Sequence, residues 1–122
     1  MTSTLAQYPH PLTELYQNQI GGTYQCDLTN RIFVTFNGVL TAFRAQDFLL
    51  FKRRVDGVDI HEMIFNLDDA YDVEIIESPR REHTFVLTLC ELIHLRDLLA
   101  GTKFALDLNT LLHERLYSVP VY

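Results

Sequence analysis

One stretch of the sequence decides the fold: Ile32-Phe33-Val34-Thr35-Phe36-Asn37-Gly38-Val39-Leu40-Thr41-Ala42-Phe43. An Asn-Gly pair between two runs of β-branched and aromatic residues is the strongest short-range indication of a β-hairpin. Both residues of a type I′ turn need a positive φ angle, which asparagine tolerates and glycine adopts freely. We therefore expect strands over residues 31–36 and 39–43, joined by a two-residue turn.

This turn also determines which side chains share a face of the hairpin. It pairs Phe36 with Val39, Val34 with Thr41 and Ile32 with Phe43. We expect these six side chains to form the core face, against which a helix packs. The opposite face carries Phe33, Leu40 and Ala42, which a two-layer domain would leave in water. Because an exposed apolar face usually marks a contact with a partner, these three residues are predicted to form a self-association surface.

The segments next to this hairpin are predicted from composition and periodicity. Residues 23–27 are expected to add a third strand, whereas residues 1–21, with two prolines around His10, are expected to be irregular. A short helix over residues 12–19 is the alternative for part of that segment. A helix is predicted over residues 45–55 and ends before Gly57. Its apolar stripe has helical spacing and comprises Ala45, Phe48, Leu49, Lys52 and Val55.

The second half of the chain gives a similar order of elements. After a short helix within residues 58–71, residues 73–77 and 84–87 are predicted to form a second hairpin. Thr88 and Glu91 have the spacing of a capping box, which opens a helix with Leu92, Leu95 and Leu99 on one face. Gly101 is expected to end that helix, and residues 103–106 to link it to a last one. The last helix starts at Asp107 or Asn109, has a stripe of Leu108, Leu111, Leu112 and Leu116, and precedes a tail over residues 117–122.

These elements predict a single α+β domain over residues 1–122. We expect two layers, with an antiparallel sheet of about five strands and two or three helices on one face. The order strand, strand, helix occurs twice, which is compatible with an internal repeat.

Charge and composition restrict the classes of function. The formal net charge is −6, from 10 basic and 16 acidic residues, and this argues against binding to nucleic acid. The sequence has no apolar stretch of the ~18 residues that span a bilayer, and residues 1–7 lack the features of a signal peptide. Two cysteines, Cys26 and Cys90, are too few for a disulfide scaffold. We therefore expect a cytoplasmic protein that does not enter a membrane.

The strongest chemical candidate is the pair Cys90 and His94, which are four residues apart on a predicted helix. Thiolate and imidazole are zinc ligands, and a cysteine near a helix N-terminus has a lowered thiol pKa. Two further ligands would be needed, and no second Cys/His pair lies nearby in the sequence. The alternative is a buried structural thiol beside a histidine that pairs with Asp97 or Glu91, and we predict no bound metal or cofactor.

Other motifs do not favour a catalytic function. Asp68, Asp69, Asp72 and Glu74 lack the spacing of an EF-hand loop and are predicted to lie in a solvated loop. No nucleophile elbow, P-loop, dinucleotide fingerprint or zincin motif is present. The favoured prediction is a non-enzymatic interaction or regulatory module that forms a homo-oligomer. The alternatives are a metal-dependent or thiol-using enzyme built around Cys90 and His94, and single-stranded nucleic-acid binding through Phe33 and Tyr24.

The run Cys26-Asp27-Leu28-Thr29-Asn30-Arg31-Ile32-Phe33-Val34-Thr35-Phe36-Asn37-Gly38, with Leu40 and Phe48 beyond it, resembles small uncharacterised bacterial domains. The resemblance implies a pair of cysteines two residues apart just before this hairpin. Here Cys26 is present and Thr29 stands at the second position, so a metal knuckle would be incomplete. The resemblance brings no activity and no ligand.

Overall fold

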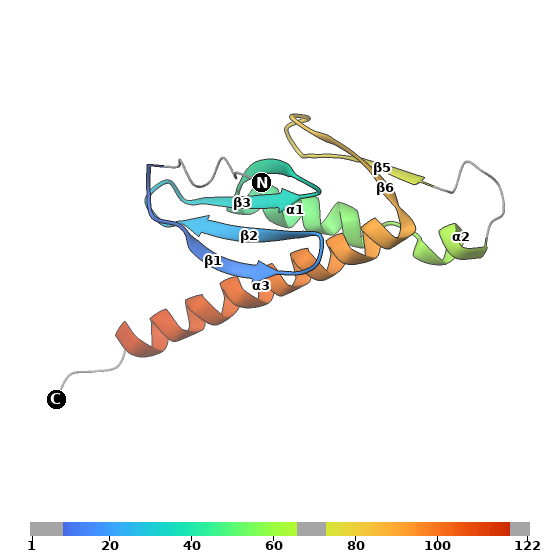
Figure 1. Ribbon diagram of the computed structural model, residues 1–122. Helices are drawn as coiled ribbons and strands as arrows, with labels where there is room; N and C mark the ends of the chain where they lie inside the picture. The colour runs from blue at the N-terminus through green and yellow to red at the C-terminus, as the bar shows by residue number, and fades with distance from the viewer. Residues whose placement is uncertain (1–8, 66–72, 118–122) are drawn as a thin grey trace.

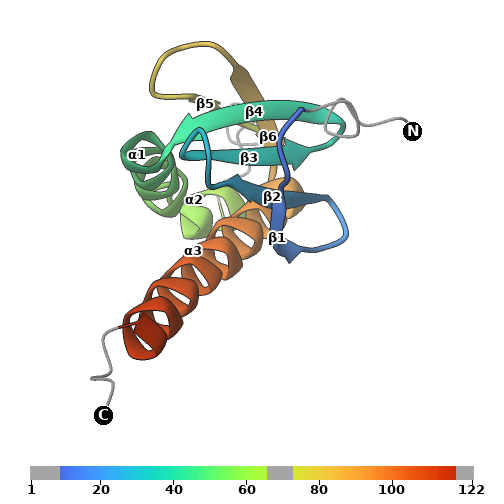
Figure 2. The same cartoon turned by 90° about the vertical axis from the view of Figure 1, so that its left-hand side faces the viewer.

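The computed structural model describes residues 9–65 and 73–117 of the chain (Figure 1). The elements follow in the order β1 (Thr13–Gln17), β2 (Gly21–Cys26), β3 (Arg31–Phe36), β4 (Val39–Arg44), α1 (Ala45–Asp56), α2 (Ile60–Phe65), β5 (Val73–Glu77), β6 (Thr84–Thr88) and α3 (Leu89–Tyr117). The fold is α+β, as predicted. Instead of one sheet of about five strands, an antiparallel sheet β1-β2-β3-β4 and a separate hairpin β5-β6 are present. In Figure 2, α1 and α3 lie on the same side of the four-stranded sheet.

The hairpin β3-β4 has the predicted turn and register. Asn37 and Gly38 have φ angles of 50° and 78°, and the register places Phe36 opposite Val39 and Ile32 opposite Phe43. Five of the six predicted core residues are buried, namely Ile32, Val34, Phe36, Thr41 and Phe43. Val39, next to the turn, is exposed because the helices do not cover that end of β4.

Aromatic side chains join the hairpin to α1 and to the second sheet. The ring of Phe51 stacks on Phe43 with centroids 5.1 Å apart and lies 5.2 Å from the ring of Phe85 on β6. Phe51 is fully buried, whereas Leu49 is exposed. The predicted stripe of α1 was therefore wrong at Leu49, and it omitted the residue that contacts both sheets.

The N-terminal segment contains a strand that the sequence did not predict. Residues 13–17 form β1, which pairs antiparallel with β2 at the edge of the sheet. The expectation of an irregular segment, or of a short helix, was therefore wrong at these positions. In the segment Thr13–Gln17, only the neighbours Leu15 and Tyr16 are partly buried against the core. Its sequence therefore does not alternate apolar and polar residues, which is the pattern that predicts a strand. Tertiary contacts with β2 and α3 therefore determine its conformation.

The helix α3 is continuous through the position at which the sequence predicted its end. It covers Leu89–Tyr117, 29 residues, so the predicted stop at Gly101, the link over 103–106, and a tail beginning at residue 117 were wrong. The reason is a close contact with β1. A Cβ atom at Gly101 would lie 2.5 Å from carbons of the Tyr16 ring, so glycine at this position lets the ring lie directly on the helix. The close contact with β1 accounts for this glycine.

Polar bonds on both sides of this contact fix α3 to β1 and β2. The Tyr16 hydroxyl donates to the Asp97 carboxylate at 3.1 Å, and this bond raises the pKa of Tyr16. The hydroxyl oxygens of Thr23 and Thr102, both fully buried, lie 2.6 Å apart. Because each buried hydroxyl has a partner, the contact satisfies the polar groups that it removes from water.

A polar contact also connects the β3-β4 turn to the start of α3. The predicted capping box is present: the Thr88 N–H donates to Glu91 at 2.9 Å, and the Glu91 N–H donates to the Thr88 hydroxyl at 3.3 Å. The second carboxylate oxygen of Glu91 accepts a bond from the Asn37 side-chain amide at 2.6 Å. These bonds, the one from the Thr88 N–H foremost, lower the pKa of Glu91, although partial burial opposes them. Asn37 thus forms the turn and also contacts the N-terminal end of α3.

We expect Gly101→Ala to destabilise the protein. In an open helix this change stabilises by ~1 kcal/mol, but here the methyl group meets the Tyr16 ring, and overpacking of this kind costs about 1–3 kcal/mol. Denaturant unfolding measures the difference. Ala100→Gly, at an exposed neighbouring position, is the control for helix propensity. A Gly101→Ala variant more stable than the wild type would contradict the Tyr16 contact.

We also expect Glu91→Gln to reduce stability at neutral pH but not in acid. The folded-state pKa of Glu91 lies below the ordinary value of 4.5, so its contribution is complete above that pH and is lost as the pH falls through the folded-state pKa. Glutamine retains the capping geometry without the charge. Melting temperatures of the two proteins should differ at about pH 7 and converge in acid, once the pH lies below the folded-state pKa of Glu91. A difference that persists in acid would show that charge is not the cause, and Glu82→Gln on the exposed β5-β6 turn is the matched control.

Candidate functional site

The predicted chemical pair lies in the first two turns of α3. Cys90 is exposed and His94 is partly exposed, whereas Cys26 is fully buried. Within the described parts of the chain, no three His, Cys, Asp or Glu side chains lie close enough together to hold a metal ion. The partners predicted for His94 make other bonds, since Asp97 binds Tyr16 and Glu91 binds Asn37. The geometry gives this pair no further ligand and no orienting group.

The predicted acidic segment is covered only in part. Asp68, Asp69 and Asp72 lie outside the described residues, and Glu74 is half-buried on β5.

The outer face of the β3-β4 hairpin differs from its prediction at the central residue. Phe33 is only 7% exposed, so the expectation that this ring lies in water was wrong. Leu40 is half-buried, Ala42 is exposed, and the half-buried Tyr24 lies opposite Phe33 in the β2-β3 register. Association through these residues remains a prediction, but Phe33 offers little free surface for it.

A row of exposed apolar side chains lies on the second half of α3. Phe104 is 69% exposed, and Leu108, Leu111 and Leu112 are 41–49% exposed. We call these four residues the α3 stripe. Leu108 follows Phe104 by four residues, and Leu111 and Leu112 follow Leu108 by three and four residues. These spacings place all four side chains on one side of the helix. The sequence had predicted Leu108, Leu111 and Leu112 as a stripe together with Leu116, whose side chain lies outside the described part of the chain.

The stripe stays exposed because it lies on the side of α3 opposite Thr102 and Leu106, which face the core, and because the end of α3 extends beyond the sheet. A helix of 29 residues is ~44 Å long, and Figures 1 and 2 show its second half continuing past β1 and β2. The buried residues of α3 end at Thr102. We call residues 103–117 the α3 extension. Local bonds support it, including the ion pair of Lys103 with Asp107 at 2.7 Å and the bond from the Thr110 hydroxyl to the Leu106 carbonyl at 3.0 Å.

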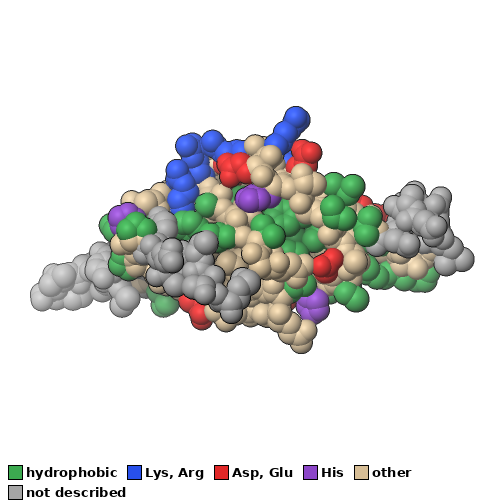
Figure 3. All heavy atoms as spheres, turned by 45° about the horizontal axis from the view of Figure 1, so that its top comes forward, with side chains coloured by type: hydrophobic (Ala, Val, Ile, Leu, Met, Phe, Trp, Pro, Cys, Tyr) green, Lys and Arg blue, Asp and Glu red, His purple; other side chains and the backbone are tan. Residues whose placement is uncertain are grey.

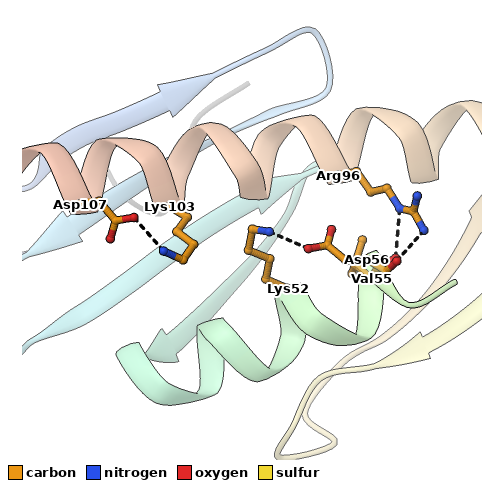
Figure 4. Close-up of polar contacts among 6 residues, drawn as sticks. All are labelled: Lys52, Val55, Asp56, Arg96, Lys103 and Asp107. Carbon is orange, nitrogen blue, oxygen red and sulfur yellow. Dashed lines mark hydrogen bonds and ion pairs between the residues drawn. The ribbon is translucent and has the colours of Figure 1, made fainter.

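The base of the extension is fixed to α1 by Arg96. Figure 4 shows its guanidinium donating to the carbonyls of Val55, at 3.2 Å, and Asp56, at 2.9 Å, and it also bonds to the Val58 carbonyl. These carbonyls lie at the C-terminal end of α1, where a positive charge is favourable. Arg96 therefore holds α3 at a fixed position relative to α1, and the extension begins from this rigid joint.

A shallow groove of about 290 Å³ lies beside this joint. It is lined by Leu49, Lys52, Arg53, Asp56 and Lys103. Lys52 pairs with Asp56 at 2.6 Å and Lys103 pairs with Asp107, so two of its three cations already have partners (Figure 4).

A second apolar patch lies on the outer face of the hairpin β5-β6. Ile75 and Val86 pair across the two strands and are 62% and 58% exposed. This patch has two exposed apolar side chains, whereas the α3 stripe has four. We call it the comparison patch.

Comparisons with known proteins give no family for this chain. No protein-family model, no curated protein and no solved structure matches it. The resemblance to small bacterial domains is therefore still a prediction. In the described parts of the chain, no helix is both long and apolar enough to cross a membrane.

Proposed function

We propose that this protein is a non-enzymatic interaction or regulatory module of the cytoplasm that self-associates through the α3 stripe. The occupant of the stripe is the same surface of a second copy. The observation that carries the proposal is the α3 extension, a helix half that packs against no other described element along its apolar side. An exposed apolar stripe on a projecting helix lowers the solubility of a protein unless another surface packs on it. A second helix with the same apolar spacing is the simplest such surface.

The spacing of the stripe favours an antiparallel pair of extensions. With the two-fold axis at Leu108, Phe104 of one copy lies opposite Leu112 of the other, and Leu108 lies opposite itself. Such an arrangement is isologous and closes at two copies. It also keeps the two globular bodies at opposite ends of the helix pair, so that they do not collide.

The charges of the extension support a second copy as the occupant. The chain carries a net charge of −6, which makes two copies repel at most approaches. The extension contains two basic and two acidic residues, Lys103, Arg115, Asp107 and Glu114. The formal charges of this segment therefore sum to zero, so two copies can approach along it without net repulsion.

The size of the stripe indicates a reversible dimer. Its four side chains present on the order of 350 Å² of apolar surface per copy, within the range of functional patches. This is less than the ~800 Å² per partner of a standard interface. We therefore expect association in the micromolar range of concentration.

Two other functions are the alternatives. A metal-dependent or thiol-using enzyme around Cys90 and His94 predicts stoichiometric zinc, or a thiol that reacts much faster than free cysteine. Single-stranded nucleic-acid binding through Phe33 and Tyr24 predicts salt-dependent binding of random oligonucleotides. Elemental analysis and one oligonucleotide titration separate these from the proposal.

Sedimentation velocity over micromolar to submillimolar concentration tests the dimer. We expect the wild type to change from monomer to dimer, and the double variant Phe104→Ser, Leu111→Ser to remain monomeric with an unchanged circular dichroism spectrum. The matched control removes the comparison patch by Ile75→Ser, Val86→Ser and should still dimerise. A wild type that remains monomeric throughout, or a stripe variant that dimerises as the wild type does, would refute the proposal.

A further inference from the structure

We propose that Arg31 and Arg44 form a binding site for a phosphate group at the end of the β3-β4 hairpin. The two residues face each other as the last pair of the β3-β4 ladder. They lie on the outer face of the sheet, because the next pair, Ile32 and Phe43, lies on the core face. Like charges placed directly opposite each other on a sheet are destabilising unless an anion lies between them.

Among the described residues, those that line the space beside this pair supply no carboxylate. A hollow of about 220 Å³ adjoins it, lined by Asn30, Arg31, Arg44, Ala45 and Gln46. In the described part of the chain, the Arg44 side chain makes no hydrogen bond or ion pair, and the Arg31 guanidinium donates only to the Thr29 carbonyl, at 3.2 Å. Figure 3 shows Lys and Arg side chains along the upper edge of the molecule, with Asp and Glu side chains beside some of them. In a chain with an excess of acidic residues, two neighbouring arginines without a carboxylate indicate that the counter-charge is a ligand.

The start of α1 adds donors to the same hollow. Arg44 is the N-cap residue of α1, with extended backbone angles and no side-chain cap bond. Ala45 and Gln46, in the first turn, line the hollow, and N–H groups at this end of a helix favour an anion. The acidic residue of that turn, Asp47, pairs instead with Arg80 at 2.9 Å. The arginine pair thus faces uncapped backbone donors, and the nearby carboxylate is already neutralised.

The chemistry and the size of the hollow select a phosphate group. Guanidinium groups bind phosphate oxygens through paired hydrogen bonds, and two of them can hold a dianion. The volume is below the ~300 Å³ of pockets that enclose whole ligands. The site therefore takes one phosphate group, either free or as the exposed end of a small monoester.

Titration with inorganic phosphate, followed by the backbone amide signals in NMR spectra, tests the site. At constant ionic strength we expect saturable shifts at Ala45 and Gln46, and chloride should produce none. Glycerol phosphate is titrated in parallel as a small monoester. Saturable binding of either ligand supports the site, and the tighter one shows whether the site prefers free phosphate or a monoester. Shifts of equal size with chloride would overturn it.

Arg44→Thr separates a ligand site from a structural one. Threonine removes one guanidinium and supplies an N-cap, so we expect phosphate to bind roughly ten- to a hundred-fold more weakly while the melting temperature in phosphate-free buffer rises. Arg53→Thr, which removes the same charge from an exposed position of α1 outside the hollow, should bind phosphate as the wild type does. Arg31→Gln is the second variant and should also weaken binding. Equal loss of binding in Arg53→Thr, or unchanged binding in Arg44→Thr, would overturn the proposal.

Discussion

The tight turn at Asn37 and Gly38 is the constraint on which the rest of the structure depends. Its two positive φ angles fix the register of β3 and β4, and the register puts Ile32, Val34 and Phe43 on the face that α1 covers. The side chain of Asn37 then bonds to Glu91 in the capping box of α3. One residue therefore sets both the core face of the sheet and the position of the longest helix.

How much of this arrangement the sequence predicts depends on whether local or distant residues decide it. The hairpins, α1 and the capping box at Thr88 follow from neighbours in the sequence, and they are present as predicted. The strand β1 and the continuity of α3 depend on a contact between Tyr16 and Gly101, which are distant in the sequence. Because a glycine after a helical pattern most often ends a helix, the sequence alone favoured the wrong interpretation. The burial of Phe33 is a tertiary effect of the same kind.

The residues of both candidate surfaces are visible in the sequence, but the sequence alone does not show that they are exposed together. The leucine stripe was visible, yet only the position of the sheet reveals that Thr102 and Leu106 face the core and that the stripe, on the other side of α3, stays exposed. In the sequence, Arg31 begins the first predicted strand of the hairpin and Arg44 follows the second. That the two residues lie opposite each other follows from the register of β3 and β4. The hollow beside them also depends on the position at which α1 begins. In both cases a helix that leaves the sheet creates the surface.

The central claim is that α3, positioned by the Asn37 turn and by Arg96, carries its extension outward to pair antiparallel with a second copy. Distance measurement between nitroxide labels on Cys90 tests this most directly, since Cys90 is exposed and Cys26 is fully buried. At ~1.5 Å per residue, an antiparallel pair centred on Leu108 separates the two Cys90 positions by about 55 Å. A dominant distance near that value is the predicted result. A much shorter distance, as in a parallel pair, or the absence of any dipolar coupling at high concentration, would contradict the account.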